Sequence, residues 1–275
     1  MFIMIFWIAS YPKSGNTWVR SLIASYLFSE SGNFDFSLLK KIPRFPNAKQ
    51  FSPLIDLNDL MKDPIKITEF WYAAQSRLNL DNKIKFLKTH NACVNYKGRW
   101  FTDEKNTIGY VYIVRDPRAA VSSYASHSSN SIKGSVGTML NENFVGLNGP
   151  YKLAEIPGTW KINYMSWKKK KAFDGIIIKY EDLIDDTERE FTKILLFFKK
   201  KMNIDINKKK ILNSINSCQF SNLSKMENIH GFDEATEGKF FREGKKDSWK
   251  NVLTQDLRKK IEENFENEMK ELGYL

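Results

Sequence analysis

Short apolar runs alternate along the chain with longer amphipathic stretches, and this alternation limits the fold more than any other feature of the sequence. The runs are rich in Ile, Val and Phe, as expected for strands that are buried on both faces. They lie at 2–9, 84–87, 108–114 and 175–179, and stretches that favour helices lie at about 15–28, 117–126, 159–171, 181–200 and 254–271. We therefore predict an α/β protein with a central parallel sheet of four to five strands, flanked by helices.

Two polar regions, at about 29–70 and 127–158, contain most of the Pro and Gly residues between these elements. We expect both to be irregular and to shape a ligand pocket, because insertions in α/β folds commonly cover the crevice at the strand ends. No internal repeat, low-complexity linker or shift in composition marks a second domain. We therefore predict one domain over residues 1–275.

Composition narrows the class of protein further. A chain of 275 residues that is 42% hydrophobic can fill a core, and Cys93 and Cys218 are too few for a disulfide framework. Neither has a second Cys or a His at metal-ligand spacing, so we expect no metal and a reducing compartment. The apolar first nine residues lack a basic start and a cleavage site and are too short to span a bilayer. We expect no membrane insertion and a cytoplasmic location.

The formal net charge of +11 raises the question of nucleic-acid binding. Much of the excess is lysine in runs at 168–171, 199–201 and 208–210, on expected helix faces and ends. The sequence has no helix-turn-helix, zinc-finger or RNA-binding signature that would organise these charges. We therefore do not expect nucleic acid as a partner, whereas small anionic ligands should be attracted.

The segment Tyr11–Trp18, with the sequence YPKSGNTW, connects the first expected strand to the first expected helix. It offers backbone amides, a lysine and hydroxyls at the positive end of a helix, which is the chemistry of an anion cradle. An ordinary polar turn would also contain Ser, Gly and Asn, but it has no evident use for Lys13. The first Gly of the Walker pattern is missing and the lysine precedes Gly15, which disfavours a magnesium-dependent kinase.

This loop resembles the phosphosulfate-binding loop of the cytosolic-type sulfotransferases, which use 3′-phosphoadenosine 5′-phosphosulfate (PAPS). Five further segments resemble motifs of that family and follow in the family's order: FLKTHNA, VYIVRDPRAAVSSY, IIIKYEDL, SNLSKMEN and FFREGKKDSWKN. With the loop, these segments span residues 7 to about 254. The resemblance implies a P-loop-NTPase-like fold and in-line transfer of a sulfuryl group from PAPS to a hydroxyl or amine, with 3′-phosphoadenosine 5′-phosphate (PAP) as product.

The resemblance also implies which residues bind the donor. Arg115 and Ser123 match the positions that bind the 3′-phosphate, and Tyr180 matches the tyrosine of the YEDL segment. The full set of expected donor-binding residues is Lys13, Ser14, Gly15, Asn16, Thr17, Trp18, Arg115, Ser123, Tyr180, Ser221, Leu223, Phe240, Phe241, Arg242, Glu243 and Gly244.

Three residues are expected to act in catalysis, namely Lys13, Lys88 and His90. Cleavage of the donor anhydride places negative charge on the leaving phosphate, which Lys13 would stabilise. An attacking alcohol must lose a proton, and histidine is a suitable general base. A lone histidine is more often structural, but His90 follows Lys88 and Thr89 at the end of an expected strand, where ligands bind in such sheets.

The chain departs from the family at several positions. Asn16 replaces a Thr, Glu243 replaces a Lys near the 3′-phosphate, and Asp247-Ser248 replaces Gly-Asp before Trp249. Asn163 stands where relatives often have His, and no role is assigned to it. The usual dimerisation pattern KxxxTVxxxE is degraded to Lys250, Thr254, Gln255 and Lys259, so we expect a monomer or a different dimer.

The acceptor is not specified by the sequence. Aromatic residues in the two polar regions favour a small or lipid-like apolar acceptor, while a phenol, a steroid alcohol and a sugar hydroxyl all stay open. Two alternatives to a sulfotransferase stay open on the residues alone. One is a kinase that uses magnesium and ATP on a small hydroxylated acceptor, and the other is a non-catalytic nucleotide-binding module.

Overall fold

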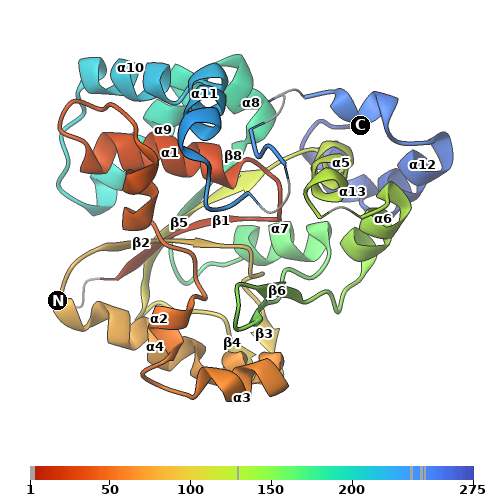
Figure 1. The fold of residues 1–275 in the computed structure, drawn as a ribbon, viewed down its shortest axis with the longest axis horizontal. Coiled ribbons are helices and arrows are strands. Elements are labelled where there is room, and N and C mark those ends of the chain that lie inside the picture. Colours follow the sequence, from red (N-terminus) through yellow and green to blue (C-terminus); the bar gives the residue numbers. More distant parts are fainter. Residues whose placement is uncertain (1–3, 129, 236–237, 242–243, 245) are drawn as a thin grey trace. The chain divides into compact units, whose positions relative to one another are not determined.

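The computed structural model describes residues 4–128, 130–235, 238–241, 244 and 246–275 (Figure 1). Its central feature is a four-stranded sheet in the order β2-β1-β5-β8. The strands are β1 (Ile5–Ser10), β2 (Lys85–Thr89), β5 (Thr107–Val114) and β8 (Gly175–Lys179). Both β2 and β5 pair with β1 in parallel, with Trp7 opposite Leu87 on one side and Tyr110 on the other. The predicted α/β class and parallel sheet are therefore confirmed, with four strands.

All six residues of β1 are buried, which explains its unbroken apolar sequence. The strand runs from Ile5 to Ser10, so it ends one residue later than predicted, and Met4 lies outside it. The other three strands lie within two residues of their predicted bounds. The match is close because a strand covered on both faces has almost no polar positions, so its sequence is easily recognised.

Contacts divide the described chain into two compact units, each built from separate stretches of sequence. The first unit comprises 4–11, Ile42–Ile113 and Glu142–Ile177, and the second comprises Pro12–Lys41, Val114–Asn141 and Ile178–Leu275. The expectation of one domain over 1–275 stays a prediction.

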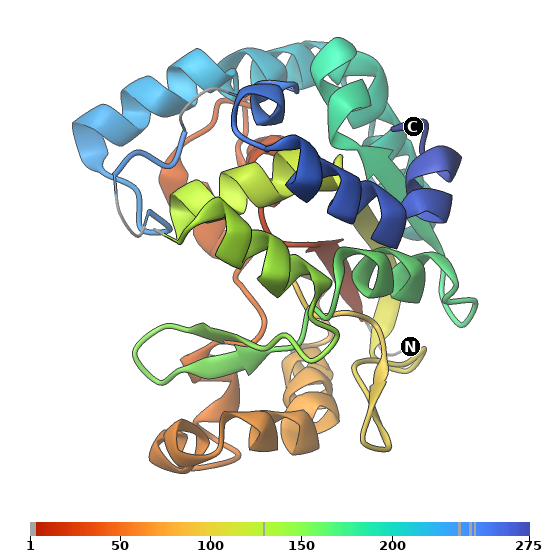
Figure 2. The same ribbon diagram turned by 90° about the vertical axis from the view of Figure 1, so that its right-hand side faces the viewer.

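The first unit contains β1, β2, most of β5 and two small hairpins. Its other elements are α2 (Ala48–Phe51), α3 (Leu57–Lys62), η2 (Pro64–Phe70), α4 (Trp71–Leu78), η3 (Asn79–Asp81), β3 (Asn95–Tyr96), β4 (Arg99–Trp100), β6 (Gly146–Asn148), β7 (Leu153–Glu155) and α7 (Trp160–Lys168). Figure 2 shows the β6–β7 hairpin beside the orange helical region of α3 and α4. The core of the unit is aromatic, with the Trp7 ring centroid 5.3 Å from Phe45 and 5.0 Å from Phe101.

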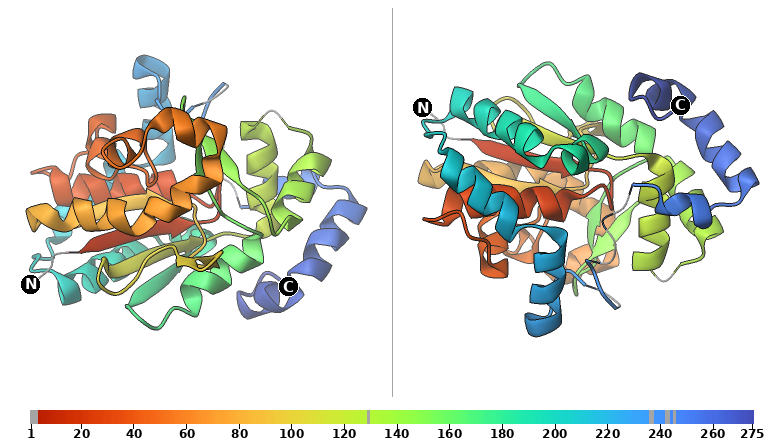
Figure 3. Two further views of the ribbon diagram at one scale, coloured as in Figure 1. Left: turned by 90° about the horizontal axis from the view of Figure 1, so that it is seen from below. Right: turned by 90° about the horizontal axis from the view of Figure 1, so that it is seen from above.

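The second unit is helical, with the end of β8 as its strand. Its helices are α1 (Asn16–Phe28), η1 (Phe36–Lys41), α5 (Pro117–His127), α6 (Ile132–Leu140), α8 (Tyr180–Asp185), α9 (Thr187–Lys201), α10 (Lys208–Ser217), α11 (Phe220–His230), η4 (Ser248–Asn251), α12 (Gln255–Asn264) and α13 (Glu266–Glu271). Helix α10 packs against both α1 and α9 (Figure 3), and α6 packs against α5 and α12 (Figure 2).

Two predicted helices are broken in the structure. The stretch 181–200 forms α8 and α9, which are separated at Asp186. The Asp186 carboxylate accepts a hydrogen bond from the backbone N–H of Arg189 at 2.9 Å and so starts α9 as its N-cap. The stretch 254–271 forms α12 and α13, which are separated at Phe265. The hydrophobic period continues across both breaks, which is why the pattern predicted single helices.

The expectation that 29–70 and 127–158 are irregular is partly wrong. The first region contains η1, α2, α3 and η2, and the second contains α6 and the β6–β7 hairpin. These elements are short and start at side-chain caps, such as Asn47 before α2 and Ser131 before α6. Helices of this length carry too few apolar positions to show a clear period, so the sequence pattern did not reveal them.

Over the residues that the structure describes, no helix is both long and apolar enough to cross a membrane. Cys93 and Cys218 are both buried as free thiols. Burial raises the pKa of each thiol to about 12, so both are protonated at neutral pH.

Candidate active site

The anion cradle predicted between β1 and α1 is built on two residues with positive φ, Lys13 at 64° and Gly15 at 93°. These angles turn the chain directly into α1, which begins at Asn16. Among the described side chains, none caps this helix start. The backbone N–H groups of the first turn therefore face the cradle without a side-chain acceptor, as an anion-binding helix start requires.

Tyr180 holds the turn closed on one side. A Cβ added to Gly15 would lie 2.3 Å from Cδ2 of Tyr180, so the two residues fit only because position 15 has no side chain. The Tyr180 ring also contacts Trp18, with centroids 5.9 Å apart, and the Arg115 guanidinium lies 4.5 Å from its centroid. The second unit thus brings together Gly15, Trp18, Arg115 and Tyr180, four of the residues that we expect to bind the donor.

Arg115 is buried at the end of β5, and its Nη1 donates a hydrogen bond to the carbonyl oxygen of Lys13 at 3.0 Å. This bond ties the expected 3′-phosphate residue to the expected catalytic lysine. Burial raises the pKa of the adjacent Tyr180, while the positive charge of Arg115 works in the opposite direction. Tyr180 is therefore a neutral phenol at physiological pH, suited to packing and hydrogen bonding.

Two hydroxyls of the cradle differ in their surroundings. Ser14 is fully buried, and within the described residues its Oγ has no hydrogen-bond partner. A buried polar atom without a partner is costly, so this atom is suited to bind a ligand oxygen. The hydroxyl of Thr17 instead donates to the Glu234 carboxylate at 3.1 Å. The same carboxylate pairs with Arg20 at 2.6 Å.

The chain after α11 supplies aromatic rings to the second unit. Lys13 Nζ lies 4.1 Å from the Phe240 ring centroid, and the Glu227 carboxylate accepts hydrogen bonds from the backbone N–H groups of Phe240 and Phe241 at 2.6 and 2.9 Å. Gly244 has a φ of 61° and lies against Phe220. Arg242 and Glu243, which we also expect to bind the donor, lie outside the described residues.

The remaining expected donor residues lie on helices of the second unit. Asn16 is buried in the first turn of α1, and Ser123 is half-buried on α5. On α11, Ser221 is exposed and Leu223 is fully buried. Their contact with the donor stays a prediction.

His90 lies in the first unit, directly after β2, and is buried. Its Nδ1 is 2.8 Å from the carbonyl oxygen of Ser10 and 3.2 Å from Ser10 Oγ. A carbonyl only accepts, so we assign the proton of the neutral ring to Nδ1, and Nε2 is left with its lone pair. This is the tautomer that a general base needs.

The charge state of His90 follows from its surroundings. Its pKa is lowered to about 3, mainly by burial; the Glu155 carboxylate opposes this shift, and the positive charges of Lys88 and Arg44 contribute to it. His90 is therefore neutral at physiological pH. Lys88, two positions earlier, is buried. Its backbone N–H donates to the Pro43 carbonyl oxygen, and its own carbonyl oxygen accepts from the Phe45 N–H.

Two residues that hold His90 were not predicted as part of the site. The buried Glu155 accepts a hydrogen bond from the backbone N–H of His90 at 3.1 Å, and its other oxygen pairs with Arg44 and accepts from Asn148 at 3.1 Å. Burial alone would raise the pKa of Glu155, but Arg44 and His90 hold it below its usual value. No local motif marks this residue, since it lies 65 positions from His90.

Asn163 is the second of these residues. Its Nδ2 donates to the carbonyl oxygens of His90 and Pro157 at 2.9 and 3.0 Å, and its Oδ1 accepts from the Tyr112 hydroxyl at 2.8 Å. It is fully buried. No role was predicted for Asn163 from the sequence, and in the structure it fixes the main chain at His90.

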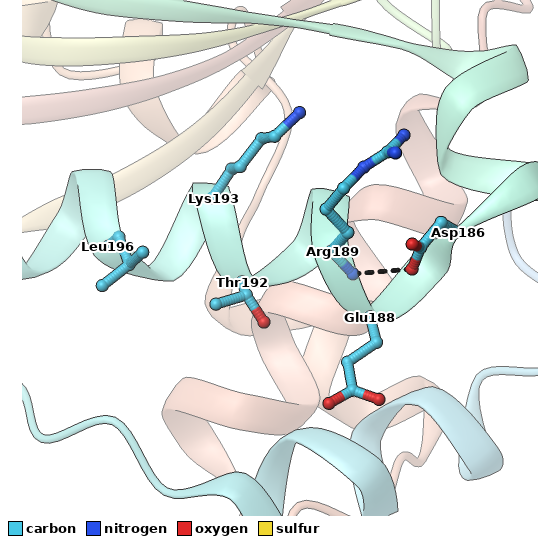
Figure 4. Close-up of a pocket in the computed structure, with 6 residues that line it drawn as sticks. All are labelled: Asp186, Glu188, Arg189, Thr192, Lys193 and Leu196. Carbon is cyan, nitrogen blue, oxygen red and sulfur yellow. Dashed lines mark hydrogen bonds between the residues drawn. The ribbon is translucent and has the colours of Figure 1, made fainter.

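A separate open pocket runs along α9 in the second unit (Figure 4). It is lined by Asp186, Glu188, Arg189, Thr192, Lys193 and Leu196. The dashed line in Figure 4 is the hydrogen bond from the Arg189 backbone N–H to the carboxylate of Asp186, the N-cap residue of α9. None of these residues belongs to the expected donor or catalytic set, and no role is assigned to the pocket.

The turn before α1 lies in the second unit and His90 in the first, and comparison with known proteins identifies the class of enzyme to which the chain belongs. The model of the sulfotransferase domain matches residues 5–273 of the chain, and the chain belongs to this family and is a sulfotransferase. The kinase and the non-catalytic module are thereby set aside.

The relatives by sequence carry names of the same class. The chain is 28% identical to flavonol 3-sulfotransferase of Flaveria bidentis over 97% of this chain and 82% of the relative. It is 26% identical to sulfotransferase 1B1 of Canis lupus familiaris over 95% of this chain and 82% of the relative. A third relative is cytosolic sulfotransferase 1 of Danio rerio, at 23% identity over 96% of this chain and 82% of the relative.

Solved structures agree on the fold. A mouse sulfotransferase in complex with PAP matches with a TM-score of 0.61 at 19% identity, covering 97% of this chain and 85% of the other. A retinol dehydratase in complex with androsterone and PAP matches with a TM-score of 0.64 at 16% identity, covering 97% of this chain and 80% of the other. Both likenesses support the sulfotransferase fold.

Proposed function

We propose that the protein transfers a sulfuryl group from PAPS to a hydroxyl or amine of a small molecule, with His90 as general base and without a metal. The observation that carries the proposal is the cradle around Gly15. Among the residues that the structure describes, no side chain caps the start of α1, and the buried Ser14 hydroxyl has no hydrogen-bond partner. The backbone at Gly15 also packs so closely on Tyr180 that a Cβ does not fit. These features suit the phosphate groups of the donor.

When bound, PAPS supplies the sulfuryl group, which leaves a phosphate that gains negative charge. We assign the binding of that phosphate to Lys13, the N–H groups of Gly15 to Trp18 and the Thr17 hydroxyl. Arg115 and Ser123 would bind the 3′-phosphate, and Trp18 and Tyr180 the adenine side. Each role follows from the family resemblance, and the contacts among Lys13, Arg115 and Tyr180 support it.

His90 would remove the acceptor proton at Nε2. Because its pKa is lowered to about 3, the ring is always available as a base but is a weak one. A weak base accepts the proton late, after the new bond to sulfur has made the acceptor oxygen acidic. The Ser10 carbonyl, bound to Nδ1–H, and the Glu155 carboxylate would then stabilise the positive ring.

We propose a small molecule as acceptor, of phenol, steroid-alcohol or sugar type, with an apolar one favoured by the aromatic residues in the two polar regions of the sequence. We also propose a cytoplasmic location, which the names of the cytosolic relatives support. The degraded dimer pattern still predicts a monomer or a different dimer.

The experiment that tests the donor is calorimetric titration of the protein with PAP, ADP and ATP in the presence of EDTA. We expect PAP to bind at least tenfold more tightly than ADP, because only PAP carries the 3′-phosphate for Arg115. Repeating the titration with magnesium should change nothing. ATP binding that requires magnesium and ignores the 3′-phosphate would contradict the proposal.

A further inference from the structure

The Glu234 carboxylate bonds both Thr17 of the cradle and Arg20, one turn further along α1. We propose that its carboxylate is a stand-in for the donor's 5′-phosphate, that it leaves Thr17 and Arg20 when the donor binds, and that it thereby sets donor affinity. Arg20 then becomes a donor-binding residue. The inference rests on the proposed function, since it concerns the same donor site.

The two contacts of Glu234 match those of a bound oxyanion. One oxygen accepts from the Thr17 hydroxyl at 3.1 Å, and the other pairs with Arg20 Nη1 at 2.6 Å. Thr17 and Arg20 both lie in the first turns of α1, three residues apart, so they share one face of the helix start. A carboxylate and a phosphate both present two oxygens to such a pair.

Thr17 cannot serve both anions. A hydroxyl has one hydrogen to donate, and this hydrogen is directed to Glu234 in the structure. A phosphate oxygen that accepts from Thr17 must therefore take the place of the carboxylate. The two negative charges would also repel each other at that distance, which drives Glu234 out.

Arg20 makes the exchange favourable for the incoming phosphate. The residue is only 2% exposed, and a buried guanidinium is costly without an anion beside it. When Glu234 leaves, a phosphate oxygen replaces it at Nη1 and keeps the charge compensated. Glu234 itself is nearer to solvent, with 29% of its side chain exposed, so its departure to water is the cheaper step.

The segment that carries Glu234 also contacts the aromatic ring that lies beside Lys13. The Phe232 ring lies 4.9 Å from Phe240, and Lys13 Nζ lies 4.1 Å from Phe240. Movement of Glu234 out of the cradle therefore acts on the aromatic group that covers Lys13. Donor binding would in this way uncover the lysine as it displaces the carboxylate.

The test compares the wild-type protein with Glu234→Gln and Asp233→Asn by calorimetry. Glutamine keeps the size of the side chain and an accepting oxygen, and it removes the competing charge. We expect Glu234→Gln to bind PAP about tenfold more tightly. It should bind 3′-AMP, which lacks the 5′-phosphate, as the wild type does. Asp233→Asn removes the same charge from the exposed neighbouring residue and should leave PAP affinity within about twofold.

Three outcomes would overturn the inference. PAP affinity that is unchanged or weaker in Glu234→Gln would show that the carboxylate does not compete. Equal tightening in Asp233→Asn, or for 3′-AMP, would show a general effect of charge. These first two outcomes leave the proposed function intact. The third outcome, a wild-type protein that does not bind PAP, would overturn the proposed function together with this inference.

Discussion

At the scale of single residues, His90 is held at its main chain as well as at its ring. Glu155 accepts from its N–H, Asn163 donates to its carbonyl, and Ser10 fixes its Nδ1. These hydrogen bonds hold both the backbone and the ring, and they thereby fix the direction in which Nε2 points.

We accordingly expect His90→Ala to lower the rate of sulfuryl transfer from PAPS to a phenol such as 4-nitrophenol by roughly 10²- to 10⁴-fold, because a general base contributes about that much. The affinity for PAP should stay within about twofold. His230→Ala, a matched substitution at an exposed histidine on α11, should leave both quantities unchanged. Normal turnover by His90→Ala would contradict the assignment of the base.

The sequence predicted His90 and Lys88 because a short motif carries both residues. It did not reveal Glu155, which contacts His90 from 65 positions away, or Arg20 and Glu234, which pair across 214 positions. Such contacts exist only after the chain has folded, and neither partner has a local pattern that marks it. Site residues that belong to a short motif can be predicted from the sequence, whereas buried pairs between distant segments cannot.

At the scale of elements, the turn between β1 and α1 is the most constrained part of the second unit's donor cradle. Gly15 needs its positive φ to start α1 and its lack of a Cβ to pack against Tyr180. Gly98 has a similar φ of 84°, but no atom lies within 4 Å of where its Cβ would be. An Ala substitution at Gly98 would cause backbone strain alone, whereas one at Gly15 would cause backbone strain and a steric clash.

We expect Gly15→Ala to weaken PAP binding at least tenfold, because Tyr180 or the turn must shift by enough to misalign the cradle. Gly98→Ala carries the same kind of backbone strain without the clash, and its PAP affinity should equal that of the wild type. Titration calorimetry at one temperature measures both. Equal affinity in the two variants would show that the contact with Tyr180 does not shape the cradle.

Element types and the ends of most strands were well predicted from the sequence, while short helices and the breaks inside long helical stretches were not. The four strands stand out because they are buried on both faces. Asp186 breaks a long amphipathic stretch into α8 and α9 by capping the second helix, an effect of one hydrogen bond that a hydrophobic period does not register.

At the scale of the whole molecule, the buried His90 links folding to pH. Its pKa falls from 6.5 in an unfolded chain to about 3 in the folded protein. The unfolded state therefore binds a proton as the pH drops below 6.5, while the folded state does not, and stability is lost over this range. From pH 8 to pH 5 the loss from this group is about 2 kcal/mol.

Chemical denaturation at pH 8 and pH 5 measures this loss. The free energy of unfolding should fall between the two pH values in the wild-type protein, and the fall should be about 2 kcal/mol smaller in His90→Asn, which has no ring to protonate. His230→Asn, at an exposed position, serves as the control and should behave as the wild type does. The same pH dependence in all three proteins would show that His90 is not the linked group.

The fold class could be predicted for the whole chain because six motifs in a fixed order accompany the alternation of strands and helices. The acceptor could not be predicted, since the region 29–70, which we expect to shape its pocket, forms short elements such as α2, α3 and η2 that have weak sequence patterns. The motif Lys250, Thr254, Gln255 and Lys259 falls on η4 and the start of α12, and its departure from the family pattern leaves the expected monomer or altered dimer as a prediction.

The two buried thiols have a practical consequence for spectroscopy. Because Cys93 and Cys218 are buried and protonated at neutral pH, they are poor nucleophiles toward maleimide reagents. A cysteine introduced at an exposed site would be the preferred target for a fluorescent dye without removal of the native pair. The two native cysteines should therefore add little unwanted labelling when a dye is attached to an introduced cysteine.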